Sequence, residues 1–372
     1  MDVTKKIGIW LTKPGLFFYA LIWMMVLLVT GTIAQKYMGL YRAQHMYFFS
    51  YYWWLGPVPL PGGYTTMAVI FINLLAKLFF ASSWHVSRAG TIIVHFGALL
   101  LLTGGFLTAL FTQEGSMTIY EGAKSDYFSD YHERELVIED SSTGEPVAAY
   151  PWRDLVVGRI LPVHKLGFTV EIVKACRNCE MVPRQGEAHD AWSSELRGRA
   201  KDFDMQSAPL EKDDENNRSG VMFRIAGTHS DKDGIHFSVD FVSVSPWVEV
   251  DGTSYSIALR KKRKYLPFAI RLLDFEKQVY PGTDTPRSFK SVIEVIEGDS
   301  HWRSVISMNE PLRYKGYTFY QSSFIDDADK SATILAVVKN VGRLFPYLSS
   351  IIMCAGLLLH LVMQLPKLIR KT

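Results

Sequence analysis

Acidic residues are almost missing from the two ends of this 372-residue chain. Of the 37 Asp and Glu residues, 36 lie between Thr112 and Gly342, and Asp2 is the other one. The same window holds 29 of the 40 Lys and Arg residues, so its formal charge is 29 − 36 = −7, whereas the remainder carries 11 − 1 = +10. This division excludes an ordinary soluble enzyme and a disordered chain, because apolar residues are abundant and gathered in blocks. The overall charge of +3 is therefore no sign of nucleic-acid binding.

The usual catalytic signatures are missing as well. The chain has no G-x-S-x-G, no phosphate-binding loop, no dinucleotide fingerprint and no H-E-x-x-H. These absences disfavour a self-contained hydrolase, NTPase or dehydrogenase, and the catalytic residues stay unknown.

Four apolar segments are long enough to cross the hydrocarbon core of a membrane, which takes about 20 helical residues. They span residues 15–34, 65–83, 90–111 and 344–365. The first exceeds the apolar stretch of a cleaved secretion signal, so we expect a retained anchor. The division into domains is then a membrane region at 1–111, a large insert at 112–342, and a final span with its basic tail at 343–372.

Positive charges next to membrane spans favour the cytoplasmic side of a bacterial membrane, so we place the ends of the segments that these charges flank in the cytoplasm. The flanking cations are Lys5, Lys6, Lys13, Arg88, Lys367, Arg370 and Lys371. Both termini are therefore predicted on the cytoplasmic side of the inner membrane, and the loop 35–64 and the insert 112–342 on the outer side.

The loop 35–64 is rich in Tyr, Phe and Trp, which suits contact with lipid headgroups better than open water. We expect an interfacial helix followed by a proline-rich bend at Gly56–Pro61. An aromatic belt without a ligand is the simplest interpretation of this loop.

The outer insert is predicted to be all-β, a sandwich or an open barrel between the third and fourth spans. Short runs rich in β-branched and aromatic residues alternate in polarity, and Asp233–Gly234 is a hairpin signal between two of them. The polar stretch from Glu180 to Gly220 breaks the pattern and is expected to be a surface excursion.

Two histidines lie inside predicted spans. His95 is near the start of the third span and His360 near the end of the fourth, so both imidazoles fall at a similar depth in the cytoplasmic half. Ionisable residues within a membrane are functional candidates, and facing imidazoles suit axial ligation of haem iron. The alternative is that each histidine only hydrogen-bonds a neighbouring helix; this alternative is the stronger one for His360.

Cys176 and Cys179 form the chain's close cysteine pair. Outside the cytoplasm a C-x-x-C is either a disulfide or a redox-active dithiol, and both interpretations stay open. The pair cannot attach haem covalently, because Glu180 stands where C-x-x-C-H requires histidine. A four-cysteine zinc site is excluded because Cys354, the third and last cysteine, lies in the fourth span.

The run Arg260–Lys264 is strongly basic. Such a run either binds a phosphate surface or an acidic partner, or it is a solvated strand edge protected against aggregation, and we expect the second. The histidines of the insert show no metal-ligand spacing and receive no role.

Several segments resemble the ResB family, also called CcsB, of the system II type of cytochrome c biogenesis. At the amino-terminal end they are Gly31–Lys36, Trp54–Gly62, Asn73–Lys77 and Val94–Leu102; in the insert they are Leu273–Phe275, Tyr280–Gly282, Phe289–Ser291, Met308–Leu312 and Gly316–Phe324. The resemblance covers both ends of the chain and is weak from about residue 140 to 251.

The resemblance implies a membrane subunit that works with a polytopic partner of the ResC or CcsA type. Such pairs carry haem b across the membrane and attach it to the C-x-x-C-H thiols of apocytochrome c, sometimes with thiol-reducing proteins. His95 occupies the position of the family's membrane haem ligand. The chain would then be an accessory subunit of a haem lyase, and the Tyr320–Phe324 motif has no chemical role that we can derive.

Two other classes of function remain open. One is a membrane cytochrome b that passes electrons through haem held by His95 and His360. The other is a cofactor-free membrane scaffold whose outer domain recruits a partner.

Overall fold

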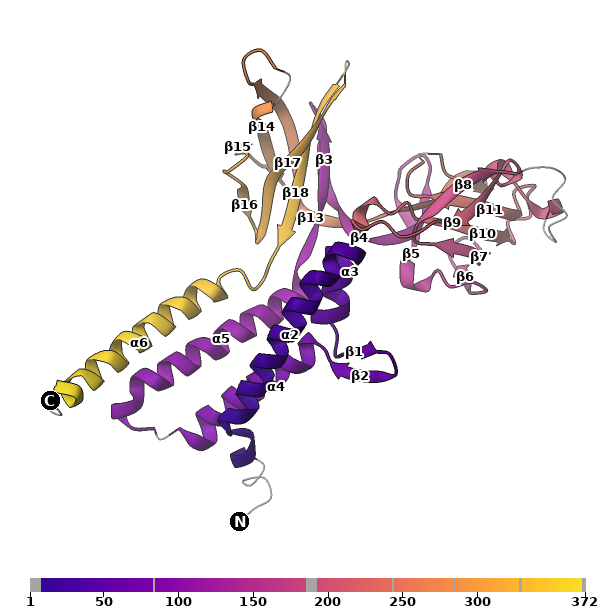
Figure 1. Cartoon of the computed structure of the whole chain (residues 1–372). Helices are drawn as coiled ribbons and strands as arrows, with labels where there is room; N and C mark the ends of the chain where they lie inside the picture. Colours follow the sequence, from indigo (N-terminus) through magenta and orange to yellow (C-terminus); the bar gives the residue numbers. More distant parts are fainter. Residues whose placement is uncertain are drawn as a thin grey trace. The chain divides into compact units, whose positions relative to one another are not determined.

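The computed structural model describes residues 8–82, 84–184, 193–242, 244–283, 286–327 and 330–369. The chain divides into two compact units (Figure 1). The first unit comprises residues 1–113, 313–318 and 338–372, and the second comprises 114–312 and 319–337. The predicted membrane region and final span fall within the first unit, and most of the predicted insert within the second.

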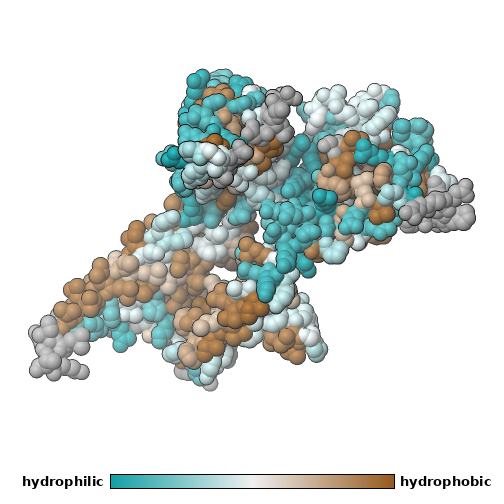
Figure 2. Space-filling model, turned by 45° about the horizontal axis from the view of Figure 1, so that its top comes forward, coloured by the Kyte–Doolittle hydropathy of each residue, from teal (hydrophilic) through white to brown (hydrophobic). Residues whose placement is uncertain are grey.

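Four helices of the described chain are long and apolar enough to cross a membrane, as predicted. They span Pro14–Met38, Gly63–Ala81, Val86–Phe111 and Phe345–Leu365. The first is helix α2; the second joins α4 (Gly63–Ala76) to the π-helical turn η2 (Lys77–Ala81); the third joins the 3-10 turn η3 (Val86–Arg88) to α5 (Ala89–Phe111); the fourth belongs to α6 (Phe345–Ile369). Many of their large apolar side chains are exposed, which suits contact with lipid, and Figure 2 shows these brown residues along the helices.

The aromatic loop contains more regular structure than we predicted. A short helix is present, made of α3 (Leu40–Ala43) and the π-helical turn η1 (Gln44–Phe48). The proline-rich segment is the second half of a hairpin, in which β1 (Tyr52–Leu55) pairs with β2 (Val58–Pro61). Proline is tolerated in β2 because this two-stranded sheet leaves one side of each strand unpaired. The predicted bend is confined to the turn at Gly56, whose φ is +61°.

Helices α5 and α6 pack backbone against backbone. A Cβ added at Gly90 would lie 2.5 Å from the backbone N of His360, and one at Gly356 would lie 2.9 Å from the backbone N of Val94. A Cβ at Gly97 would lie 2.6 Å from Cγ of Met353. Gly90, Gly97 and Gly104 recur every seven residues, so they share one face of α5. Small residues at such a seam let two helices approach closely within a membrane.

Among the described residues, sixteen strands lie between α5 and α6 in chain order. They are β3 (Gln113–Tyr120), β4 (Lys124–Asp140), β5 (Pro146–Pro151), β6 (Ile160–Val163), β7 (Phe168–Cys176), β8 (Cys179–Pro183), β9 (Phe203–Ser207), β10 (Gly220–Ala226), β11 (Gly234–Val239), β12 (Trp247–Val250), β13 (Thr253–Val279), β14 (Pro286–Glu297), β15 (Ser300–Ser307), β16 (Leu312–Tyr314), β17 (Tyr317–Asp327) and β18 (Lys330–Lys339). The all-β content of the insert is thereby confirmed.

The strands form three sheets. The largest has the order β15-β14-β13-β4-β3-β18-β17-β16, with β12 beside β13 and β5 beside β4; the second is β11-β10-β7-β6; and β8 pairs with β9. Side chains of the two larger sheets share one buried core, to which β4 gives Leu136, β7 gives Ile172, β10 gives Phe223 and β13 gives Ile257. Burying each such side chain is worth about 1.5–3 kcal/mol. The sandwich or open-barrel form stays a prediction.

The strongly basic run lies on a stretch of β13 that pairs with β4 alone among the described strands, since β12 pairs with residues 253–256 and β14 with residues 269–279. The position at a strand edge agrees with the expectation, but the run is less solvated than expected. Arg260 pairs with Glu135 at 3.0 Å and with Glu139 at 2.7 Å, and Lys264 pairs with Asp130 at 2.7 Å. Ion pairs with acidic residues of β4 therefore neutralise part of the run.

The described part of the stretch from Glu180 to Gly220 is more ordered than a surface excursion, while residues 185–192 lie outside the described residues. Its β8 and β9 pair in an antiparallel ladder, and Met205 of β9 is fully buried in a second core with Met222, Ile235 and Phe237. The predicted hairpin is present, since β10 and β11 pair and Gly234 opposes Ile225.

We expect Gly90→Ala to lower the free energy of unfolding by about 1–3 kcal/mol, because the new methyl group would meet the backbone of α6 and not a movable side chain. Unfolding of the detergent-solubilised chain by SDS measures this loss. Gly105→Ala is the matched control, because nothing lies within 4 Å of a Cβ there. Equal stability of the two variants would contradict the close packing of α5 and α6.

Candidate functional site

The imidazole of His95 is oriented by its own helix. Nδ1 of His95 lies 2.7 Å from the backbone carbonyl oxygen of Thr91, one turn earlier in α5. A carbonyl oxygen can only accept a hydrogen bond, so Nδ1 carries the proton and donates it. The lone pair is then on Nε2, which is the form of imidazole that binds iron, and the side chain is half-buried.

His360 contacts the same residue from the neighbouring helix. Its Nδ1 lies 3.3 Å from the hydroxyl oxygen of Thr91, and either atom can donate depending on the tautomer. Thr91 therefore links both predicted histidines, and the expectation that they lie at a similar depth in their helices agrees with this contact. The hydrogen bond also shows a packing role for His360, which was the alternative to iron ligation.

The seam between α5 and α6 is closed beside the backbone of His360. That backbone lies against Gly90, and Gly356 lies against the backbone of Val94. The donor chemistry of His95 fits an iron ligand, whereas the surroundings of His360 fit helix packing. The ligand roles of both residues stay predictions.

Asn73, from one of the segments that resemble the ResB family, has a structural explanation. Its side-chain amide is buried and donates hydrogen bonds to the carbonyl oxygens of Leu11, at 2.5 Å, and Lys13, at 3.2 Å. These carbonyls stand just before α2, so Asn73 of α4 ties the start of the first span to the second.

Cys176 and Cys179 form a disulfide across the turn between β7 and β8. Their exposed fractions are 5% and 1%, and both belong to the core around Met205. Thiol exchange requires an attacking thiolate to reach a sulfur atom, so burial supports a structural disulfide over an exchanging one. The redox role stays a hypothesis without support from this geometry.

A buried polar cluster holds the turn between these cysteines. Arg177 donates to the carbonyl oxygen of His132 at 2.6 Å and to the carboxylate of Asp214 at 2.7 Å, and Nδ1 of His132 lies 2.9 Å from the same carboxylate. Burial alone would raise the pKa of Asp214, but hydrogen bonds from His132 and Arg177 lower it to about 2. No role was predicted for His132 from the sequence. Because 82 residues separate it from Asp214, no local pattern indicates this contact.

The late motifs of the insert meet one another in the second unit. Phe324 of β17 lies 5.5 Å, between ring centroids, from both Phe275 of β13 and Phe289 of β14. The buried Gln321 accepts a hydrogen bond from Ser291 at 2.7 Å. Three motifs distant in sequence therefore make one packing arrangement, which gives Gln321 and Phe324 of the Tyr320–Phe324 motif a packing role.

These features define a class of protein: a chain with four candidate membrane spans and a large all-β unit. Residues 245–334 match the ResB-like family, and this segment contains the motifs that meet around Phe324. The predicted resemblance to the ResB family is confirmed, and residues 245–334 are its ResB-like segment. His95, His360 and the cysteine pair lie outside it.

One relative supports the same placement. The chain is 30% identical over 115 residues to Protein NrfI of Wolinella succinogenes. The alignment covers 30% of this chain and 12% of that protein, so the chain spans only a small part of its relative.

Asp214→Asn is expected to lower the free energy of unfolding at neutral pH. The further decrease of this free energy in acid should be smaller in the variant than in the wild type. The folded-state pKa of Asp214, about 2, lies below the usual Asp value of 3.8. The stabilisation from its hydrogen bonds is therefore present above pH 4 and is lost as the pH falls toward 2. The difference corresponds to about 2 kcal/mol. Urea unfolding of the full chain between pH 6 and 2.5 measures it, with Asp213→Asn, at an exposed neighbour, as the control. Parallel pH profiles of the unfolding free energy for wild type and Asp214→Asn would contradict the stabilisation of Asp214 by His132 and Arg177.

Cys176 and Cys179 should resist maleimide labelling in the native chain, even after mild reductant, and react once the chain is unfolded. The physical reason is the burial of both sulfur atoms. A Ser142→Cys variant, at an exposed turn position, serves as the reactive control under the same conditions. Mass spectrometry locates the label. Rapid labelling of both Cys176 and Cys179 in the native chain would favour the exchanging dithiol instead.

Proposed function

We propose that this chain is a membrane subunit of a cytochrome c maturation complex, which works with a ResC- or CcsA-type partner. The observation that carries the proposal is the ResB-like segment at residues 245–334, together with the relative NrfI. The complex would move haem b across the bacterial inner membrane and support its attachment to the thiols of apocytochrome c. The chain alone would be an accessory subunit and not a complete haem lyase.

Composition and charge support the proposed membrane placement. The four apolar helices would supply the spans, and the cations that flank them support an orientation with both termini inside. The second unit, with its excess of acidic residues, would then lie on the outer side, where apocytochrome c is matured.

Within this scheme His95 would hold the iron of the transported haem. Its Nδ1–H donates to the carbonyl of Thr91, which fixes the ring and leaves Nε2 as the ligand atom. A neutral ligand in a site without water also slows oxidation of the iron, and thioether formation needs reduced iron. The opposing ligand would come from the partner, because the contacts of Gly90 and Gly356 close the space beside His360.

The second unit would present or orient the apocytochrome, while Cys176 and Cys179 hold a turn in place. Reduction of the client thiols would fall to other, thiol-reducing proteins, since the disulfide is buried. The cytochrome b alternative requires haem between His95 and His360 and is disfavoured by the same glycine contacts. A cofactor-free scaffold differs from the proposal in requiring no haem at all.

His95→Gly should abolish the low-spin haem spectrum of the chain co-expressed with its partner, and added imidazole should restore it. Imidazole supplies the missing ligand in the space left by the side chain, which a merely structural role of His95 would not permit. Absorption spectra of the purified complex, with and without imidazole, measure the result, and cytochrome c maturation should fall at least tenfold.

Two variants make this test specific. His85→Ala removes an exposed histidine of the short connection before α5 and should leave the spectrum unchanged. His360→Ala should also retain haem, because its contact is to Thr91. Loss of haem in both His95→Gly and His360→Ala, with haem bound by the chain expressed alone, would favour the cytochrome b. Absence of haem under every condition would favour the scaffold.

A further inference from the structure

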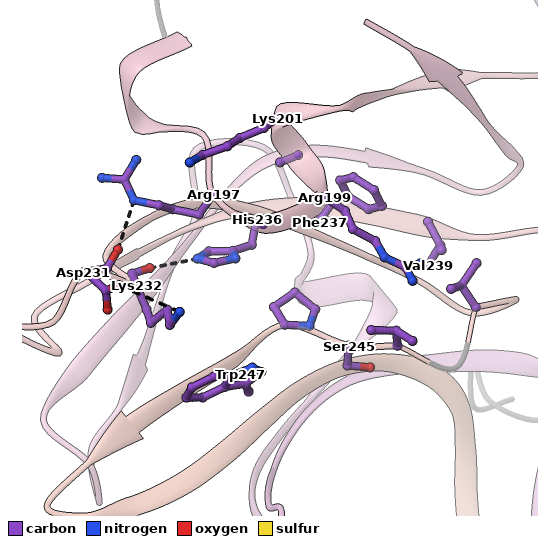
Figure 3. Close-up of a pocket in the computed structure, with 15 residues that line it drawn as sticks. Arg197, Arg199, Lys201, Asp231, Lys232, His236, Phe237, Val239, Ser245 and Trp247 are labelled. Carbon is purple, nitrogen blue, oxygen red and sulfur yellow. Dashed lines mark hydrogen bonds and ion pairs between the residues drawn. The ribbon is translucent and has the colours of Figure 1, made fainter.

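A cavity of about 590 Å³ lies in the second unit, between the 3-10 turn η6 (Gly198–Lys201), strand β11 and the start of β12 (Figure 3). Its volume is that of a typical small-molecule site. Most of its lining residues precede the ResB-like segment, which begins at residue 245. The cavity therefore belongs mainly to the part of the chain where the family resemblance is weak.

The cavity concentrates positive charge within an acidic unit. Its lining contains Arg197, Arg199, Lys201 and Lys232 but only one acid, Asp231, so the formal charge is 4 − 1 = +3. The surrounding window from Thr112 to Gly342 carries −7. Asp231 is 86% exposed and 3.8 Å from Lys232, so this ion pair offsets little of the charge.

Two of the cations have no partner within the described structure. Arg199 and Lys201 are exposed and form no ion pair with any carboxylate of the described residues. By contrast, Arg197 is fixed, because its guanidinium donates to the carbonyl oxygens of Ser194, Leu196 and Asp231. The cavity thus combines one immobilised cation with two that are available to an anion.

Apolar and aromatic residues also line the cavity. Phe237, Val242, Pro246 and Trp247 are among them, and Trp247 is 47% exposed although its ring lies 4.7 Å from Nζ of Lys232. Figure 3 shows Trp247 across the cavity from Lys201 and Arg197. A half-exposed indole beside cations suits stacking with a planar group that carries negative charge.

The cavity wall is held rigidly in place. The segment before η6 bonds to β11 through a parallel bridge between Leu196 and Ile235, and the backbone N–H of Arg197 donates to the carbonyl oxygen of Ile235 at 2.9 Å. Burial lowers the pKa of His236, and its Nε2–H donates to the carbonyl oxygen of Lys232 at 2.8 Å. The neutral His236 therefore has a structural role in the cavity lining.

We propose that this cavity binds a small amphipathic organic anion, with a planar apolar body against Trp247 and a carboxylate or phosphate head against Arg199 and Lys201. The site is separate from His95 and does not depend on the proposed role in haem transfer. Both halves of the ligand are required: the cations supply attraction for the head, and the aromatic wall supplies apolar burial for the body.

Calorimetric titration of the full chain in lipid nanodiscs tests the site, with 1-naphthyl phosphate as the probe and empty nanodiscs as the blank. Inorganic phosphate represents the head alone. We expect the naphthyl compound to bind roughly tenfold or more tightly than phosphate, which corresponds to burial of its ring system. Arg199→Gln with Lys201→Gln should weaken its binding roughly tenfold or more.

The matched control is Lys165→Gln with Lys212→Gln, which removes the same charge from exposed positions outside the cavity. Trp247→Leu should weaken naphthyl phosphate and leave inorganic phosphate unaffected. Equal loss in the control pair would mean that overall charge drives binding and would overturn the proposal. So would tighter binding of a hexaglutamate peptide than of naphthyl phosphate, or no detectable binding of naphthyl phosphate by the wild type.

Discussion

The close approach of α5 and α6 is the constraint on which the membrane part of this structure depends. Gly90 and Gly356 bring the two backbones together, and no residue with a larger side chain fits at Gly90 without moving α6. This approach places Thr91 between His95 and His360. The same two helices are the chain's entry to and exit from the strand-rich region, since β3 follows α5 and β18 precedes α6. A substitution at the seam would therefore affect the contacts of Thr91 with the two histidines.

The second unit depends on a different device, the pairing of two long strands. β4 and β13 run side by side and contribute to the core shared by two sheets. β13 contains the basic run Arg260–Lys264, and β4 supplies Glu135, Glu139 and Asp130 as partners for Arg260 and Lys264. Part of the acidic excess of the unit therefore compensates the positive charge of β13.

The sequence predicted the helices and the family better than the contacts between distant residues. Long apolar segments reveal spans because a membrane imposes length and composition, and the four predicted segments agree with the four helices. The ion pairs of the basic run were not predicted, because local charge does not say which strand lies opposite. The clamp of Asp214 by His132 and Arg177 was missed for the same reason, and so was the cavity beside Trp247. His95 was found because a histidine in an apolar span is rare, whereas its tautomer required the carbonyl of Thr91 to be located.

The two histidines illustrate how the backbone divides roles between similar side chains. His95 and His360 are both half-buried in apolar helices and both contact Thr91 through Nδ1. His95 receives a carbonyl partner, which determines its tautomer and directs the lone pair to Nε2. His360 receives a hydroxyl, which accepts either tautomer, and its backbone is pressed against Gly90. The different surroundings of the two imidazoles follow from their partners: a carbonyl one turn earlier for His95, and a residue of the neighbouring helix for His360. These surroundings favour our proposal of a haem site shared with a partner over a complete bis-imidazole site within this chain.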